Sequence, residues 1–146
     1  MSDLEDFVEF KVKKYSKFQS NIVYITYLKE TLTTDPELFD EFIKKYRESL
    51  IGCGEKNTFL VVNSKEIKSI DFTYVWSKMD VISKLDDLAR QYLAGTAYII
   101  NNVFFKTMGN SIMKVYKPVV PTKICNDNKE AIEFMNNVLS QLNKKE

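Results

Sequence analysis

The side chains that could carry out acid–base or metal chemistry are few and scattered in this chain. It contains no histidine, the side chain that most often exchanges protons near neutral pH. Carboxylates, lysines and cysteines could replace it, but none of them forms a pair with diagnostic spacing. The two cysteines, Cys53 and Cys125, stand far apart, whereas zinc commonly takes four ligands from short clustered motifs. We therefore expect a protein that is not an enzyme and holds no metal or other cofactor.

A candidate recognition or modification site lies at Asp71, Thr73 and Tyr74, where a long stretch with helical periodicity begins. Free N–H groups and the helix dipole stabilise negative charge at such a point. Thr73 could therefore present a hydroxyl for phosphorylation, or this helix end could bind a partner. The structural alternative is that Asp71 or Thr73 only caps the helix.

Basic residues gather in a segment without acidic residues, from Leu88 to Asn126. Because the formal net charge of the chain is only +1, we expect no general attraction to nucleic acid. The local charge favours an acidic protein or anionic lipid head groups, and the structural alternative is a solvated lysine face. The lysines of this basic patch are Lys106, Lys114, Lys117 and Lys123.

Three aromatic residues are candidates for lining a ligand site: Trp76, Phe104 and Phe105. Trp76 falls in the first turn of the long predicted helix. Phe104 and Phe105 are adjacent, so one is expected to face the core and the other to face outward or sideways. Core packing is the structural alternative for all three, and a partner surface or lipid contact is the functional one.

Length and composition indicate one domain over residues 1–146, with frayed ends at 1–6 and 143–146. Hydrophobic residues make up 45% of the chain and charged residues 28%, which is typical of a soluble globular protein. The first six residues are acidic and polar, unlike a secretory leader, and no apolar run approaches the roughly 20 residues of a membrane span. We therefore expect a cytoplasmic protein with free thiols and no transmembrane segment.

The elements that must position these residues follow from periodicity. Alternation predicts a strand over 8–13, and β-branched and aromatic residues predict a second over 21–28, paired with the first as a hairpin. A helix begins after Asp35-Pro36 and reaches about residue 51. A short apolar strand over 58–62, a long helix from about Thr73 to near Gly95, and another apolar strand over 97–100 then form a βαβ unit.

The rest of the chain continues the alternation of helix and strand. A helix is predicted over 104–116, a short strand over 121–125, and a last helix after a capping box at Asp127 and Glu130. The order ββαβαβαβα, with four helices, predicts an α/β layer sandwich around a mixed sheet of about five strands.

This order and several local sequences resemble STAS and SpoIIAA-like domains, whose best-known members are anti-sigma-factor antagonists. The likeness runs from about Val8 to Leu142. In that family a strand leads through an "IDSSGL" turn into the second helix, and Ser69–Val75, SIDFTYV, occupies the corresponding place. Asp71 matches the family aspartate, and Thr73 stands where many members carry a phosphorylatable serine. The resemblance implies a non-enzymatic module for protein interaction or regulation, or a phospho-switched antagonist that uses Thr73.

A second set of residues is similar to the CRAL-TRIO lipid-binding domains, a neighbouring branch of the same fold. Ala97–Asn102, Phe104, Lys117-Pro118 and Lys123-Ile124 look like the "yiiN…F…kP…KI" run of that family. The resemblance implies, as an alternative function, a module that binds a small ligand or lipid. A cavity between the sheet and the helices bearing Trp76 and Phe104 would distinguish it from an interaction module, whose partner would be another protein or a second copy of the chain.

Overall fold

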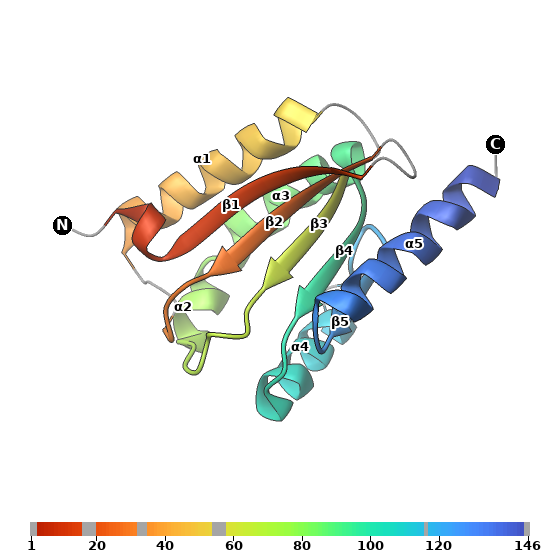
Figure 1. Cartoon of the computed structure of the whole chain (residues 1–146). Coiled ribbons are helices and arrows are strands. Elements are labelled where there is room, and N and C mark those ends of the chain that lie inside the picture. The colour runs from red at the N-terminus through yellow and green to blue at the C-terminus, as the bar shows by residue number, and fades with distance from the viewer. Residues whose placement is uncertain (1–2, 16–19, 32–34, 54–57, 116, 145–146) are drawn as a thin grey trace.

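A five-stranded mixed sheet forms the centre of the protein (Figure 1). The computed structural model describes residues 3–15, 20–31, 35–53, 58–115 and 117–144. The strands lie side by side in chain order: β1 (Val8–Tyr15), β2 (Ser20–Tyr27), β3 (Thr58–Asn63), β4 (Leu93–Ile99) and β5 (Thr122–Cys125). β1 and β2 pair antiparallel, as predicted for the hairpin, and the remaining neighbours pair parallel.

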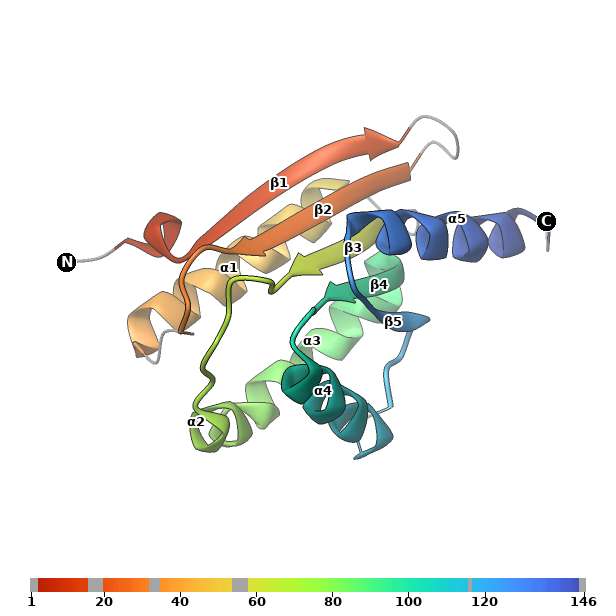
Figure 2. The same cartoon turned by 60° about the horizontal axis from the view of Figure 1, so that its bottom comes forward.

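The helices cover the two faces of this sheet unequally (Figures 1 and 2). They are α1 (Pro36–Cys53), α2 (Phe72–Ser77), α3 (Met79–Tyr92), α4 (Val103–Val115) and α5 (Asn128–Lys144). The first four lie on one face, because right-handed crossovers that step along the sheet in one direction place their helices on the same side. Helix α5 packs alone against β4 and β5 on the other face. The predicted α/β layer sandwich is confirmed.

Each face of the sheet has its own hydrophobic core. Leu60 and Val62 point toward α1 and α3, while Phe59 and Val61 point toward α5, so β3 is buried on both faces. A continuous apolar run is typical of such a strand. Met135 of α5 is fully buried on the second face.

The predicted helix starts are borne out by hydrogen bonds. Asp35 Oδ1 accepts a bond from the Glu37 N–H at 2.9 Å, and Asp127 Oδ1 accepts one from the Glu130 N–H at 3.0 Å. The Glu130 carboxylate reaches one residue further back than predicted and accepts a bond from the Asn126 N–H at 3.0 Å. These bonds satisfy backbone donors that the first helical turns leave free.

The long predicted helix is divided into α2 and α3, which makes five α-helices instead of four. Lys78 leaves the helical conformation at φ −103° and ψ 4°. Ser77 Oγ donates a hydrogen bond to the Tyr74 carbonyl at 2.6 Å, and the Lys78 N–H donates to the Val75 carbonyl at 3.0 Å. These short-range bonds tighten the turn and compete with the regular helical ladder.

Gly95 does not stop the helix as predicted, because α3 ends at Tyr92 and Gly95 lies within β4. A Cβ atom at Gly95 would come within 2.7 Å of Phe59 Cε2 and 3.1 Å of the Pro121 carbonyl oxygen. The glycine is therefore required by close packing in the sheet.

The predicted frayed ends are more ordered than expected. Leu4–Asp6 forms a short 3-10 helix, η1, because Leu4 is buried against the core beside β1. Helix α5 continues to Lys144, and residues 1–2 and 145–146 lie outside the described residues. Within the described ranges, no helix has the length and apolar character that would be needed to span a membrane.

Candidate functional site

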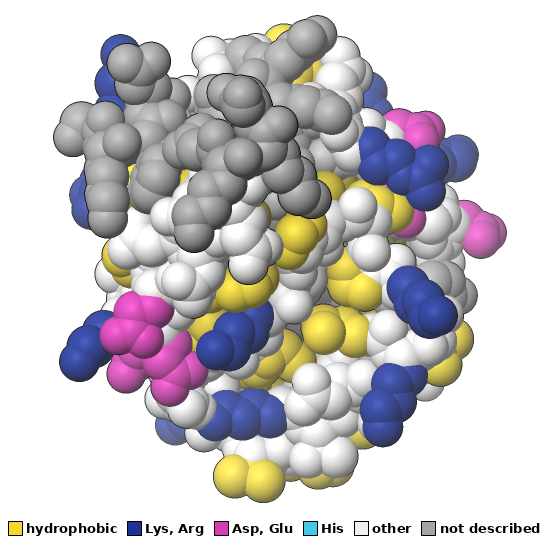
Figure 3. Space-filling view, turned by 90° about the vertical axis from the view of Figure 1, so that its right-hand side faces the viewer, with side chains coloured by type: hydrophobic (Ala, Val, Ile, Leu, Met, Phe, Trp, Pro, Cys, Tyr) yellow, Lys and Arg dark blue, Asp and Glu magenta, His cyan; other side chains and the backbone are white. Residues whose placement is uncertain are grey.

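A cavity of about 740 Å³ lies between the sheet and the four helices on its first face. Strands β2, β3 and β4 form its floor, and α1, α2, α3 and α4 contribute its walls. Most of the lining side chains are hydrophobic, and Figure 3 shows a hollow with hydrophobic walls. A cavity in this position is the feature expected of a ligand-binding module.

The cavity lies toward the carboxyl ends of the parallel strands. Tyr27 ends β2, Ser64 follows β3, and Ile100 follows β4, and all three line it. In open α/β sheets, ligands commonly bind outside this edge at a point where the strand order reverses. The described strands here follow one another in chain order, so the cavity, and not this rule, marks the site.

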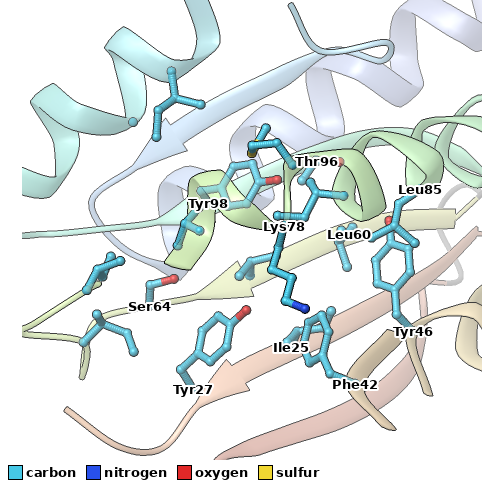
Figure 4. A pocket seen from close by; sticks show the side chains of 18 of the residues that line it. Ile25, Tyr27, Phe42, Tyr46, Leu60, Ser64, Lys78, Leu85, Thr96 and Tyr98 are labelled. Carbon is cyan, nitrogen blue, oxygen red and sulfur yellow. The ribbon is translucent and has the colours of Figure 1, made fainter. Parts of the chain in front are cut away.

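Tyrosine side chains from three elements point into the cavity (Figure 4). They are Tyr27 of β2, Tyr46 of α1 and Tyr98 of β4. Burial raises the pKa of all three hydroxyls, and the nearby Asp86 carboxylate raises the pKa of Tyr46 and Tyr98 further. The hydroxyls are therefore neutral near pH 7 and can donate hydrogen bonds.

Tyr98 shows how the cavity is enclosed. Its side chain is 36% exposed, yet burial is the main cause of its raised pKa. The exposed surface of the Tyr98 ring faces the cavity, and the protein atoms around the ring account for the raised pKa. We therefore place Tyr98 among the residues that would contact a molecule held there.

Lys78, at the break between α2 and α3, is the half-buried cation of the cavity lining. Its Nζ lies 5.4 Å from the ring centroid of Phe39 and 5.7 Å from that of Tyr74, distances that allow cation–π attraction. Within the described residues Lys78 has no carboxylate partner in an ion pair. The ammonium therefore lies beside two aromatic rings and forms no ion pair within 4 Å with a described carboxylate.

Of the predicted site residues Asp71, Thr73 and Tyr74, only the first and the last line the cavity. Asp71 Oδ1 accepts a hydrogen bond from the Tyr74 N–H at 3.1 Å, which confirms the capping interpretation for Asp71. Asp71 and Tyr74 line the cavity, whereas Thr73 is exposed and lies outside its lining. The Tyr74 hydroxyl is buried and has no hydrogen-bond partner among the described residues. Partner binding and phosphorylation at this helix end stay predictions.

Of the three aromatic residues proposed to line a ligand site, Phe105 does so and is 7% exposed. Phe104 is 60% exposed and Trp76 is 46% exposed, and both lie outside the cavity lining. Neighbouring helical residues point in directions about 100° apart. Phe105 and Val75 therefore take the inward positions, while Phe104 and Trp76 lie outside the lining of this cavity, and a ligand contact at either stays a prediction.

Helix α4, which bears Lys106 and Lys114, packs against β5, which bears Lys123. Lys123 alternates with Thr122 and Ile124, which line the cavity, so it points to the other face of the sheet. Three lysines of the basic patch are exposed, and Lys106 is half-buried. Lys117 also lines the cavity, and Figure 3 shows Lys and Arg side chains bordering the hollow. No ion pair joins these lysines to a residue that the structure describes. In the same ranges, no group of three or more His, Cys, Asp or Glu side chains could hold a metal ion.

Sequence reasoning missed the polar groups inside the cavity. Lys78 and Asp86 share helical spacing with Val75, Ile82 and Ala89, and all five line the cavity. Two charged residues therefore interrupt an otherwise apolar helical stripe. This interruption is the feature of the sequence that could have indicated polar groups in the cavity. The inward tyrosines left no such signal, because Tyr27 and Tyr98 lie in strands, where aromatic residues are common, and Tyr46 lies on the apolar stripe of α1.

Comparisons with known proteins support the fold and leave the function open. Residues 16–139 match the model of a family described as a domain of unknown function, DUF7793. A solved structure of an uncharacterised DUF3478-family protein with a SpoIIAA-like fold, from Shewanella loihica PV-4, is similar to this chain with a TM-score of 0.63 at 11% identity. The likeness covers 92% of this chain and 98% of that one, and it confirms the predicted SpoIIAA-like fold. A search of curated proteins found no match.

Proposed function

The chain belongs to the DUF7793 family, and we propose that this member of it is a non-enzymatic domain that binds a small, largely apolar molecule. The cavity between the sheet and α1–α4 carries this proposal. Its volume of about 740 Å³ falls within the range of about 300–1,000 Å³ that is usual for pockets that hold small ligands. The similarity of residues 97–124 to CRAL-TRIO domains points in the same direction.

The distribution of polar groups supports an amphipathic ligand. Ligand pockets typically combine apolar walls with a few polar groups that fix orientation. Here the walls come from side chains such as Leu60, Phe42 and Leu85, and the polar groups are the tyrosine hydroxyls and Lys78 (Figure 4). Apolar burial supplies the affinity, and the polar groups select the ligand.

Saturable binding of dodecanol, a neutral alkyl probe, tests the proposal. It can be measured by displacement of an environment-sensitive naphthylamine dye. Leu85→Trp places a larger side chain into the cavity, while Val103→Trp adds the same side chain at a position that is 77% exposed and outside the lining. We expect the native chain and Val103→Trp to bind dodecanol and Leu85→Trp to lose binding, with all three folded by circular dichroism. Absence of binding by the native chain would refute the proposal.

Protein interaction is the second candidate function, and the exposure of Trp76 favours it. Trp76 lies on α2 beside the predicted recognition residues Asp71 and Thr73, and large exposed aromatic residues are enriched where partners bind. Because it is the only tryptophan, its fluorescence reports its burial directly. Self-association would shift its emission to shorter wavelength as concentration rises, together with a doubling of the native mass. Trp76→Gln would then prevent the doubling, whereas Val115→Gln, at another exposed position, would not.

A further inference from the structure

We infer that the ligand carries a carboxylate that pairs with Lys78, with an alkyl or similarly apolar chain along the cavity. This inference rests on the proposed function and names the chemical class of its ligand. The observation behind it is the placement of an ammonium group among aromatic rings inside an apolar cavity.

A half-buried charge in such a setting favours a counter-ion. Taking an ammonium group out of water is costly unless an opposite charge or hydrogen-bond acceptors compensate it. The rings of Phe39 and Tyr74 offer only cation–π attraction to Lys78. No carboxylate of the described residues forms an ion pair with Lys78. An anionic group on the ligand would supply the missing partner.

The number of positive groups indicates a singly charged anion. Three lysines line the cavity, but Lys29 and Lys117 are exposed, and only Lys78 is half-buried. The described lining holds no arginine, and arginine is the side chain best suited to bind phosphate with paired hydrogen bonds. The Tyr27 hydroxyl also points into the cavity and can donate to a carboxylate oxygen. One ammonium and a neutral hydroxyl donor match a carboxylate better than a phosphate.

Two carboxylates line the cavity, Asp71 and Asp86. Asp71 Oδ1 accepts a hydrogen bond from the Tyr74 N–H, whereas the Asp86 carboxylate acts on the Tyr46 and Tyr98 hydroxyls and would repel an anion beside them. Asp86 follows Lys78 by eight residues, which corresponds to about 12 Å along the axis of α3. The carboxylate of the ligand therefore binds at the Lys78 end, and the apolar chain extends along the wall formed by Ile82 and Leu85.

Competition between compounds of one chain length tests the inference on the full chain. Dodecanoate, dodecanol and dodecylamine differ only in the head group. A hydrogen-bonded ion pair is worth about 1.5–3 kcal/mol, so we expect dodecanoate to bind roughly 10- to 150-fold more tightly than dodecanol. Dodecylamine should bind no better than the alcohol, because its ammonium would face that of Lys78.

Substitutions test whether the preference for dodecanoate over dodecanol depends on Lys78. Lys78→Met keeps an apolar side chain of similar length and should weaken dodecanoate binding by the same factor while leaving dodecanol binding unchanged. Lys84→Met, an exposed lysine of α3 outside the cavity lining, should change neither affinity. Asp86→Asn should retain the preference for dodecanoate or increase it.

Equal binding of dodecanoate and dodecanol by the native chain would overturn the inference while the proposed function stands. A preference that survives Lys78→Met unchanged would also overturn it. If neither compound binds the native chain, the proposed function fails as well. The dodecanol measurement thus distinguishes the two failures.

Discussion

Replacing Gly95 by alanine tests the packing between β3 and β4 at one atom. The added Cβ would lie 2.7 Å from Phe59 Cε2, 3.3 Å from Phe59 Cζ and 3.1 Å from the Pro121 carbonyl oxygen. The Phe59 ring is fully buried and packs edge-on against Phe134, with ring centroids 5.8 Å apart. The ring therefore has little room to move away from the new methyl group.

The expected cost follows from this geometry. Overpacking a well-filled core usually destabilises a protein by about 1–3 kcal/mol. For a chain of this size each kcal/mol corresponds to about 2–4 °C, so we expect the melting temperature of Gly95→Ala to fall by roughly 2–12 °C. Thermal unfolding followed by circular dichroism measures this change.

Gly52 provides a control of opposite sign. It lies within α1, and no atom would come within 4 Å of a Cβ placed there. Alanine at this position should stabilise the helix, by up to about 1 kcal/mol. The double variant Gly95→Ala with Phe59→Leu should lose less stability than the two single changes summed, because the smaller side chain relieves the contact. If Gly95→Ala melts with the native chain, the Phe59 ring does not lie where this packing requires.

Four further variants test the helix starts and the basic patch. Asp71→Ala should lower the free energy of unfolding by about 1 kcal/mol through loss of the α2 cap, and Thr73→Ala should lower it by less. Unfolding in urea measures both changes. Equal midpoints for Asp71→Ala and the native chain would argue against the cap. Hydrogen bonds from Asn126 lower the pKa of Glu130, so this stabilisation is present at neutral pH and is lost as pH falls through the folded-state pKa. Glu130→Gln should therefore melt below the native chain at neutral pH and together with it in acid, and coincident melting at neutral pH would contradict this. Vesicles containing phosphatidylserine should retain the native chain at low salt more than a triple-alanine variant, at about 1 kcal/mol per lysine, and equal retention would leave the patch a solvated surface. The lysines replaced in that variant are Lys106, Lys114 and Lys117.

The strands and most helices could be predicted because their signals are local. A continuous apolar run over 58–62 and helical spacing after Asp127 depend on neighbouring residues alone, and both elements occur as expected. The break at Lys78 could not be predicted in this way, because it is associated with one hydrogen bond, from the Ser77 hydroxyl to the Tyr74 carbonyl, and not with a repeating pattern of residues. The role of Gly95 also escaped prediction, because it depends on Phe59, which is distant in the sequence.

The candidate site was predicted only in outline. A residue that faces a cavity and a residue that faces a packed neighbour have the same apolar periodicity, so the stripe of α3 predicts a buried face in either case. How far α1 and α4 stand from the sheet is set by long-range packing. The adjacency of Phe104 and Phe105 predicted that one of them would face inward, but which of the two does so depends on the placement of α4.

The separate cores on the two faces of the sheet allow the lining of the cavity to vary independently of the framework. Successive residues of a strand point to opposite faces. Leu60 lines the cavity, while the next residue, Val61, packs on the α5 side with Met135. Changes at every second position of β3 would therefore remodel the floor of the cavity, while the intervening positions keep α5 anchored. Such a frame can acquire a cavity of new shape through a small number of substitutions without a new fold.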